Sequence, residues 1–526
     1  MRASVADNLA GRPGVSPWSL CAGSDQVWFV PDVQPAADEV AALRAANARL
    51  RQVIEARDTE IAAMRASYQV QLDALRAQVA ALAAEVADLR ARLGQNPRNS
   101  SRPPSAEGLA KPAPRSLRKK SGRKPGRPKG QPGATLEMTG RPDALVTHEP
   151  GRCHGCGAGL VGAPVTSTER RQVIDLPEDI GAVTTEHRII SRRCSCGTVT
   201  SGAAPAWVTA PVQYGPRLAA VCAYLWHGQF LSRGRTCKAV GELFGVPVSP
   251  GAVAGMVRRI AGRLGAPLAA IREALIAADV VHFDETGFRV NGKLARVHSA
   301  SSGKFALITV HGKRGRSGMD VAGVLPAFCG IAVHDCWAPY DGYHQVTHAL
   351  CNAHGLRELQ AVSDAALAGQ WCWAAQAADA LRDMKHLADA SLVTDGTLHH
   401  VDQAKLAGAR HRYHSALLLG RRETAARAGP LMRKHHALAR RLLAREDDYL
   451  RFTSDSRVPF DNNAAEREIR MSKLRIKVSG CMRSMAGAEA FCAIRSYLST
   501  AAKHGIGMLD ALTSAARGAA WVPETA

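Results

Sequence analysis

The sequence predicts a multidomain α/β protein. Three observations predict it: a sustained heptad repeat near the N-terminus, strand patterns after about residue 275, and helical patterns on both sides of those strands. At 526 residues the chain has room for two to four domains. We divide it into 1–36, unassigned; 37–93, coiled coil; 94–135, basic linker; 136–210, cysteine-knuckle domain; 211–275, helical region; 276–355, α/β core; 356–452, helical segment; and 453–526, the remainder.

The chain is strongly basic, with 68 Lys and Arg against 46 Asp and Glu and a formal net charge of +22. This excess favours a polyanionic partner, of which nucleic acid is the commonest. No apolar run approaches the roughly 18 residues that span a bilayer, and the N-terminus has no signal-peptide pattern, so no membrane partner is expected. We expect a cytoplasmic, nucleoid-associated bacterial protein. Its 13 cysteines are then metal ligands or buried thiols rather than disulfides.

Residues 37–93 carry a heptad repeat. A second apolar residue follows most repeat positions, three residues later before Tyr68 and four residues later from Tyr68 onward. This change of spacing is a stutter. A stripe sustained over more than seven heptads must be buried on something, so we expect a homodimer or higher homo-oligomer. Asn47 is the polar core position that fixes register. The repeat positions are Val40, Asn47, Ile54, Ile61, Tyr68, Leu75, Leu82 and Leu89.

The linker that follows is crowded with Pro, Ser, Gly and Arg. Between Lys111 and Lys129 it holds many bases and no acid, so it cannot form a core. One part resembles an AT-hook, whose Gly-Arg-Pro centre lies in the minor groove of AT-rich DNA. A generic phosphate-binding linker is the alternative. The basic residues of the hook-like part are Arg123, Lys124, Arg127 and Lys129.

Two pairs of cysteines follow the linker. Cys153 and Cys156 lie on a Gly-containing turn, and Cys194 and Cys196 form a second pair after a hairpin-like stretch. Four sulfurs on two knuckles suit one tetrahedral Zn²⁺. The second pair has one intervening residue instead of the usual two, so buried thiols of a degenerate knuckle are the alternative.

The region 211–275 has helical periodicity and a helix-turn-helix layout. A turn at residues 244–249 separates two helices, and Ser249 is the predicted N-cap of the second, which starts at Pro250. Arg258 and Arg259 on that helix are candidate DNA contacts. A small helical bundle without DNA contact gives the same pattern.

The stretch Ala278–Phe288 is an apolar run that ends in two acids and reads as a buried strand. A period of two places His282, Asp284 and Thr286 on one face and Glu285 on the other. An acid at the end of a buried strand either caps a turn or has a functional role. Asp284 is therefore the first candidate ligand for a divalent metal.

A second strand repeats this ending. Between Asp284 and this second strand the sequence predicts strands at Leu294–Ser299 and Lys304–His311 and a helix at Val321–Phe328. The run Gly330–Trp337 contains an apolar strand followed by His and Asp335. Two such strands side by side hold both carboxylates at one edge of a sheet. That arrangement predicts a site for a hard divalent cation.

A third acid comes from the segment after residue 459. A helix that begins there, with Asp461 as its N-cap, presents Glu466 and continues the same face with Arg470 and Lys473. An acid beside bases suits a site that grips a metal and a phosphate together. A surface ion pair between Glu466 and Arg470 is the alternative.

These motifs resemble the signature blocks of the insertion-sequence-66 family of bacterial DDE transposases, over nearly everything from residue 37 onward. The blocks that carry the resemblance are His282-Phe283-Asp284-Glu285-Thr286-Gly287, His334-Asp335 with Trp337-Ala338-Pro339-Tyr340, Cys351-Asn352-Ala353-His354, and Asp461-Asn462-Asn463-Ala464-Ala465-Glu466-Arg467.

The resemblance implies a ribonuclease-H-like catalytic core with a helical insertion and an acidic triad of Asp284, Asp335 and Glu466. Two Mg²⁺ ions, or Mn²⁺, are then the expected cofactors, and the expected reaction is DNA cleavage and strand transfer on insertion-sequence ends and target DNA. Accessory transposition proteins are further expected partners. Cys351 and His354 offer only two ligands, so we expect them to pack the junction beside the site. The alternatives are a non-catalytic DNA-binding relative and a structure-specific nuclease on the same core.

Overall fold

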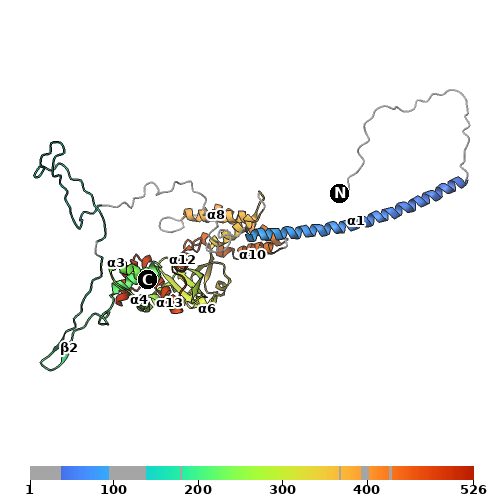
Figure 1. Cartoon of the computed structure of the whole chain (residues 1–526). Helices are drawn as coiled ribbons and strands as arrows, with labels where there is room; N and C mark the ends of the chain where they lie inside the picture. The colour runs from blue at the N-terminus through green and yellow to red at the C-terminus, as the bar shows by residue number, and fades with distance from the viewer. Residues whose placement is uncertain are drawn as a thin grey trace. The chain divides into compact units, whose positions relative to one another are not determined.

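A computed structural model describes residues 37–93, 138–177, 180–366, 369–391, 402–425 and 429–525 (Figure 1). The first 36 residues and the predicted AT-hook-like part of the linker lie outside the described residues, so their assignments stay predictions. The chain divides into two compact units, Met1–Ala83 and Ala84–Ala526, which we describe separately.

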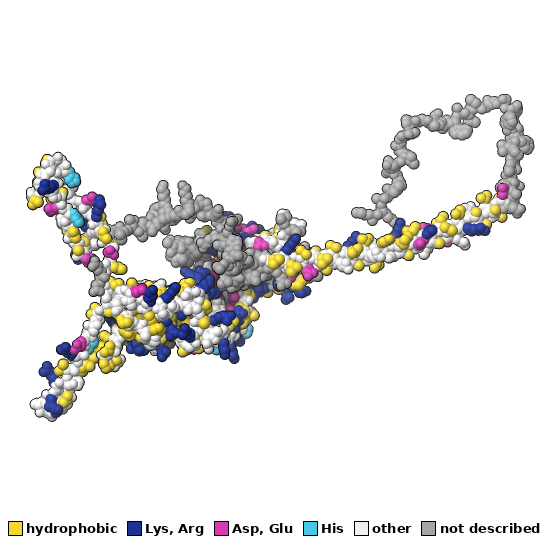
Figure 2. All heavy atoms as spheres, in the orientation of Figure 1, with side chains coloured by type: hydrophobic (Ala, Val, Ile, Leu, Met, Phe, Trp, Pro, Cys, Tyr) yellow, Lys and Arg dark blue, Asp and Glu magenta, His cyan; other side chains and the backbone are white. Residues whose placement is uncertain are grey.

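The heptad region forms one continuous helix, α1 (Ala37–Leu93), which confirms its predicted helical conformation. Its apolar repeat positions are exposed in the single chain; Leu75 and Leu82, for example, are 57% and 61% exposed. Figure 2 shows hydrophobic side chains along the length of this helix. A stripe of this length in water is costly unless a partner covers it.

The predicted helical region consists of several short helices. The Ser249 hydroxyl accepts the N–H of Ala252 at 3.1 Å, which confirms the predicted N-cap. The turn before it begins at Gly245 in the left-handed conformation, with φ 66°. The elements are α2 (Pro216–Ala223), the π-helix η2 (Tyr224–Gly228), α3 (Arg233–Phe244), α4 (Pro250–Gly262) and α5 (Gly265–Ile276).

These helices share one core with the C-terminal helices α13 (Met485–Lys503) and α14 (Met508–Arg517). Fully buried Ile260 and Leu264 belong to the same cluster as Tyr497 of α13. Segments more than 200 residues apart in sequence are therefore one structural body. No helix in the described ranges is long and apolar enough to cross a membrane.

A five-stranded mixed sheet follows, in the order β5-β4-β3-β6-β7. The first three strands are antiparallel, and β6 and β7 run parallel to β3. Asn291 and Gly292 both have positive φ, 48° and 72°, as a type I′ hairpin turn requires. The strands are β3 (Val280–Val290), β4 (Lys293–Ser301), β5 (Ala306–His311), β6 (Ile331–His334) and β7 (Thr347–Leu350).

The structure departs from the predicted strands and helices in three places. Strand β3 does not end at the acids but runs on to Val290, because residues 284–290 pair with β4. The predicted helix Val321–Phe328 is wrong: this stretch is a series of turns, and a short helix, α6 (Arg316–Asp320), precedes it. Gly323, at φ +67°, and Pro326 are poor helix residues and explain the error. Strand β7 was not predicted.

The segment between β7 and the last predicted acid is helical, as expected. Its helices pack a core that includes Val333 of β6 and Leu350 of β7. The helices are α7 (Asn352–Asp364), α8 (Trp373–Ser391), α9 (Gln403–Ala425), α10 (Pro430–Ala444) and α11 (Glu446–Leu450), followed by the 3-10 turn η4 (Arg451–Thr453). A further 3-10 turn, η3 (Ala338–Gly342), lies between β6 and β7. The chain then returns to the sheet through α12 (Asn463–Ser479), which packs on β3 and β4.

A small antiparallel hairpin, β1 (Ser191–Arg193) and β2 (Val199–Ser201), holds the second cysteine pair in its turn.

Candidate active site

The sheet brings the first two predicted acids to equivalent places on neighbouring strands. Strand β3 pairs in parallel with β6, and the last registered pair is His282 with Val333. Asp284 and Asp335 each lie two residues beyond that pair. The register therefore puts both carboxylates at the same level of the sheet, as the two strand endings predicted.

The third acid, Glu466, lies on the first turn of α12, and Asn462 fixes this turn to the sheet. The Asn462 side chain is 2% exposed and donates through Nδ2 to the carbonyl oxygen of Phe283 at 2.7 Å. Its Oδ1 accepts from Nδ1 of His282 at 2.9 Å, and its backbone N–H donates to Sγ of Cys351 at 3.2 Å. One buried amide thus joins β3, α12 and the start of α7.

The predicted N-cap of α12 is wrong by one residue. The helix begins at Asn463, and Asn462 occupies the cap position without a side-chain capping bond. The carboxylate of Asp461 still accepts the N–H of Asn463 at 3.0 Å. The reason is that the Asn462 amide is already engaged by β3, so it does not turn back to its own helix.

The acids are electrostatically coupled. Burial raises the pKa of Asp284 to about 8, and the charges of Glu285, Asp335 and Glu466 act in the same direction. Burial likewise raises the pKa of Asp335, with the Glu285 charge as the next cause. Like charges held together in a partly dry site favour protonation until a cation compensates them. The site thus has the electrostatics of a cation-binding site.

Glu285 is a fourth acid, whose influence the sequence reasoning missed. The predicted alternation is right, since His282 faces α12 while Phe283 packs in the core on the other side of the sheet. However, the Glu285 charge still raises the pKa of Asp284 and Asp335, although strand alternation directs its side chain to the other face. The Glu285 carboxylate is 5% exposed and pairs with Arg314 at 2.9 Å, with the Tyr340 hydroxyl donating to it at 3.5 Å.

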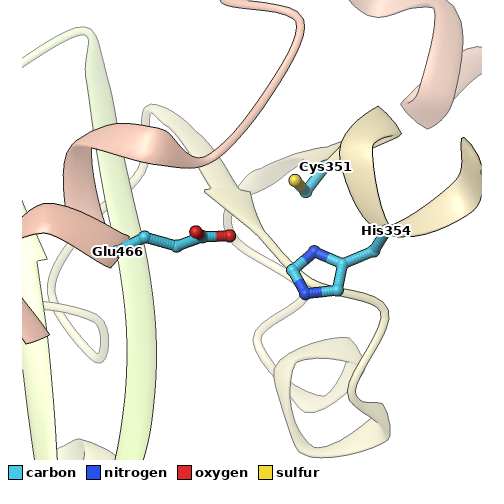
Figure 3. A group of neighbouring side chains, drawn as sticks. All are labelled: Cys351, His354 and Glu466. Carbon is cyan, nitrogen blue, oxygen red and sulfur yellow. The ribbon is translucent and has the colours of Figure 1, made fainter. Parts of the chain in front are cut away.

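Cys351, His354 and Glu466 form a compact group of potential metal ligands. In the part of the chain that the structure describes, their ligand atoms all lie within 4.8 Å of one another. Figure 3 shows the Glu466 carboxylate pointing towards the other two side chains. The sequence motif predicts only two ligands here, Cys351 and His354; the third, Glu466, comes from α12. By the same criterion, the described oxygens of Asp284, Asp335 and Glu466 do not form such a group.

Of the two partners of Glu466 in this group, Cys351 is buried and His354 is half-buried. Burial raises the pKa of the Cys351 thiol to about 11 and lowers the pKa of His354. The Cys351 sulfur already accepts an N–H, as a packing residue does, whereas Nδ1 of His354 has no hydrogen-bond partner. Glu466 therefore lies between two sets of groups. Cys351 and His354 are potential metal ligands beside it. Its charge also raises the pKa of Asp284 on the sheet.

Comparison with known families identifies the chain. Residues 211–490, more than half of it, match the profile of the Transposase IS66 family. The chain belongs to this family. Residues 32–137 match a second profile, DUF6444, which describes a family of unknown function. No curated protein matches the chain.

The IS66-family match confirms the resemblance, and its range includes the three predicted acids and the candidate DNA contacts of the two helical regions. Arg258 and Arg259 are exposed on α4, and Arg470 and Lys473 are exposed on α12 beyond Glu466. On the face drawn in Figure 2, Lys and Arg side chains are numerous over the folded core. Their roles in DNA binding remain predictions.

Each cysteine pair of this IS66-family chain lies on a tight turn. Gly157 N–H bonds the Cys153 carbonyl at 2.9 Å, and Gly197 N–H bonds the Cys194 carbonyl at 2.9 Å, with both glycines at positive φ. The hydrogen bond between Cys196 Sγ and the Thr198 hydroxyl is the main cause that lowers the pKa of Cys196 to about 7. The four sulfurs are not among the described groups whose ligand atoms converge, so Zn²⁺ binding by Cys153, Cys156, Cys194 and Cys196 stays a prediction.

Proposed function

We propose that the chain is a Mg²⁺-dependent DNA transposase that cleaves the ends of an insertion sequence and joins them to target DNA. Membership of the IS66 family supports the general activity. Two observations support the site. The register of β3 and β6 puts Asp284 and Asp335 at the same level of the sheet. Burial, and then the charges of Glu285, Asp335 and Glu466, raise the pKa of half-buried Asp284. The mixed sheet with two parallel strands beside β3 is compatible with a ribonuclease-H-like core.

The residues present fit a hard divalent cation. Asp284, Asp335 and Glu466 offer carboxylate oxygens, which Mg²⁺ prefers. Among the described residues, the two Asp carboxylates accept hydrogen bonds from the backbone N–H groups of Glu285 and Trp337. When bound, two Mg²⁺ or Mn²⁺ ions supply activation of a water or 3′-hydroxyl nucleophile and charge stabilisation at the leaving oxygen.

The chain's own residues orient this reaction. Asn462 fixes the first turn of α12, which carries Glu466, to β3. Arg314 forms an ion pair with the Glu285 carboxylate. Arg470 and Lys473 would bind phosphates along α12. The α3–α4 pair, the cysteine knuckles and the basic linker would recognise the DNA ends, and a coiled-coil homodimer would bring two sites to two ends.

A strand-transfer assay with the full-length protein, Mg²⁺ and DNA carrying the element's terminal repeats tests this proposal. Asp284→Asn, Asp335→Asn and Glu466→Gln should each reduce cleavage by at least about 100-fold while DNA binding persists. The matched control is Asp279→Asn, because Asp279 is an exposed acid at the start of the same strand. Cleavage without joining would favour a structure-specific nuclease. DNA binding with neither cleavage nor joining would favour a non-catalytic relative. Full activity of all three variants would rule out the triad.

A further inference from the structure

A strongly basic pocket lies at the opposite end of α12 from Glu466. It has a volume of about 410 Å³ and is enclosed by η2, the first turns of α3 and α13, part of α4, and the loop after α12. Four arginines line it: Arg233, Arg258, Arg475 and Arg483. None of its lining residues, all of them described, is Asp or Glu. The pocket therefore selects for an anion.

Two helices direct their N-terminal ends to this pocket. Residues 232–234 of the α3 start and residues 484, 486 and 487 of the α13 start line it. Neither helix has an acid in its first turn, so neither positive helix end is neutralised by its own sequence. The hydroxyls of the N-cap residues Ser232 and Ser484 accept one N–H in each helix, from Arg235 and Gly487. The other N–H groups of a first helical turn and the helix dipole form a general phosphate-binding arrangement.

The wall of the pocket also contains buried polar groups without partners. Arg475 is 5% exposed and its Nε has no hydrogen-bond acceptor. His227 is 1% exposed and its Nδ1 is likewise unpartnered, as is the indole Nε1 of Trp226. Burial and the nearby Arg233 charge lower the pKa of Arg475. Unsatisfied buried donors are rare in folded proteins and point to a missing acceptor.

The backbone at the pocket is unusual. Trp226 and His227 lie in the π-helical turn η2, and Phe230 just beyond it has φ +61°, a conformation that bulky residues rarely adopt. The Ser479 hydroxyl, at the end of α12, donates to the Phe230 carbonyl and holds this turn. Such local strain concentrates at functional sites.

The pocket is rigidly connected to the acids. Arg475 lies nine residues after Glu466 on α12, about 14 Å along the helix axis at 1.5 Å per residue. The loop after α12 is also fixed to the β3–β4 hairpin, since Met482 N–H donates to the Arg289 carbonyl and Asn291 N–H donates to the Met482 carbonyl. Nine residues are also two and a half helical turns, so Arg475 projects from the opposite face of α12 to Glu466.

We propose that this pocket binds a backbone phosphate of the DNA on which the chain acts. The inference rests on the proposed function and adds a specific phosphate site to it. A bound phosphate would meet the two helix ends and the four arginines, and it would compensate a charge that the chain itself leaves uncompensated.

The test is binding of a fluorescein-labelled 20-nucleotide single strand by the full-length protein in EDTA, measured by anisotropy over a range of salt concentrations. The double variant Arg233→Gln/Arg483→Gln should weaken binding about tenfold at 0.1 M salt and reduce the salt dependence of log K by about one to two. The matched control is Arg235→Gln, an exposed arginine in the first turn of α3 that does not line the pocket. It should change binding less than twofold.

A second variant separates binding from folding. Gly234→Asp places an acid at the pocket, and an added Cβ there meets nothing within 4 Å. An acid in a first helical turn stabilises the helix, so the melting temperature should hold or rise while DNA binding weakens. If both variants bind DNA like the wild type, the pocket proposal is wrong.

The remaining outcomes separate this proposal from the proposed function. Wild-type DNA binding and cleavage with unaffected variants would leave the transposase function standing and overturn the pocket. A wild-type protein that neither binds nor cleaves DNA would overturn the function itself. Inorganic phosphate, added at constant ionic strength, distinguishes binding of a free anion from binding of DNA. A pocket for the free anion predicts that phosphate raises the melting temperature of the wild type but not of the double variant, while the two proteins bind DNA equally. That result would overturn the proposed DNA contact.

Discussion

The side-chain amide of Asn462 donates a 2.7 Å hydrogen bond to the backbone carbonyl of Phe283. Phe283 directly precedes Asp284, and Asn462 lies four residues before Glu466. This single contact therefore links the first and third predicted acids, which are 182 positions apart in the chain. The relative placement of the two carboxylates depends on a neutral residue that binds no metal itself.

We predict that Asn462→Ala lowers the free energy of unfolding of the core by about 2–3 kcal/mol, because it leaves the Phe283 carbonyl and His282 without their buried partner. It should also reduce Mg²⁺-dependent cleavage, since the first turn of α12 is no longer fixed to β3. Denaturant unfolding and the cleavage rate measure the two effects. Asn463→Ala, at the exposed next position, should change stability by less than about 0.5 kcal/mol. Equal effects of the two substitutions would contradict the role of Asn462.

The pKa of Asp284 predicts how stability depends on pH. Without metal, the unfolded state ionises near 3.8 while the folded state keeps the proton to about 8. The contribution of Asp284 to the free energy of unfolding is therefore complete below pH 3.8. It is lost as the pH rises from 3.8 to about 8, and the free energy of unfolding falls by up to about 1.4 kcal/mol per pH unit. We predict that Asp284→Asn flattens the decline in stability between pH 5 and pH 7. Urea unfolding in EDTA at both pH values measures it, and parallel curves for the two proteins would refute the assignment.

The same pKa predicts a linkage between metal binding and pH. A cation bound to the Asp284 carboxylate displaces its proton, so Mg²⁺ affinity should rise with pH up to about 8, by as much as tenfold per unit. The rise of the melting temperature with Mg²⁺ concentration, measured at pH 6.5 and pH 8, reports this affinity. In Asp284→Asn the midpoint concentration should be higher and should depend less on pH.

Two substitutions beside the acids should shift the pH dependence of cleavage in opposite directions. Glu285→Gln removes a charge that raises the pKa of both Asp284 and Asp335, so the acidic limb of the profile should move to lower pH. Arg314→Gln removes a charge that lowers the pKa of Asp335 and should move the limb to higher pH. Profiles measured at saturating Mg²⁺ test both. Shifts in the same direction would show that the effect is structural and not electrostatic.

Local sequence patterns were sufficient to predict much of this fold. The strand period around Asp284, the helix cap at Ser249 and the long heptad helix are all confirmed, because each depends on residues within a few positions of one another. The failures have different causes. The β3 strand extends beyond the acids because of its pairing with β4, and the short strand β7 depends on its parallel partner β6, so neither is visible in its own residues.

The motif resemblance predicts the acids Asp284, Asp335 and Glu466, and their catalytic role stays a prediction. It did not predict that Asn462 bridges three elements or that Glu466 lies beside Cys351 and His354. Those contacts join residues more than 100 positions apart, and no periodicity reports them. The basic pocket is a further example, since its arginines lie on α3, α4, α12 and the following loop.

The last prediction concerns the exposed stripe of α1. If it forms the interface of a homo-oligomer, Leu75→Lys/Leu82→Lys should dissociate the full-length protein, because two charges enter a core where apolar side chains pack. Val70→Lys/Ala77→Lys has the same spacing on the opposite face of the helix and is the matched control. Sedimentation velocity at micromolar concentration should show the wild type and the control as oligomers and the first variant as a monomer. A wild-type monomer would refute self-association, whereas oligomers of all three proteins would place the interface elsewhere.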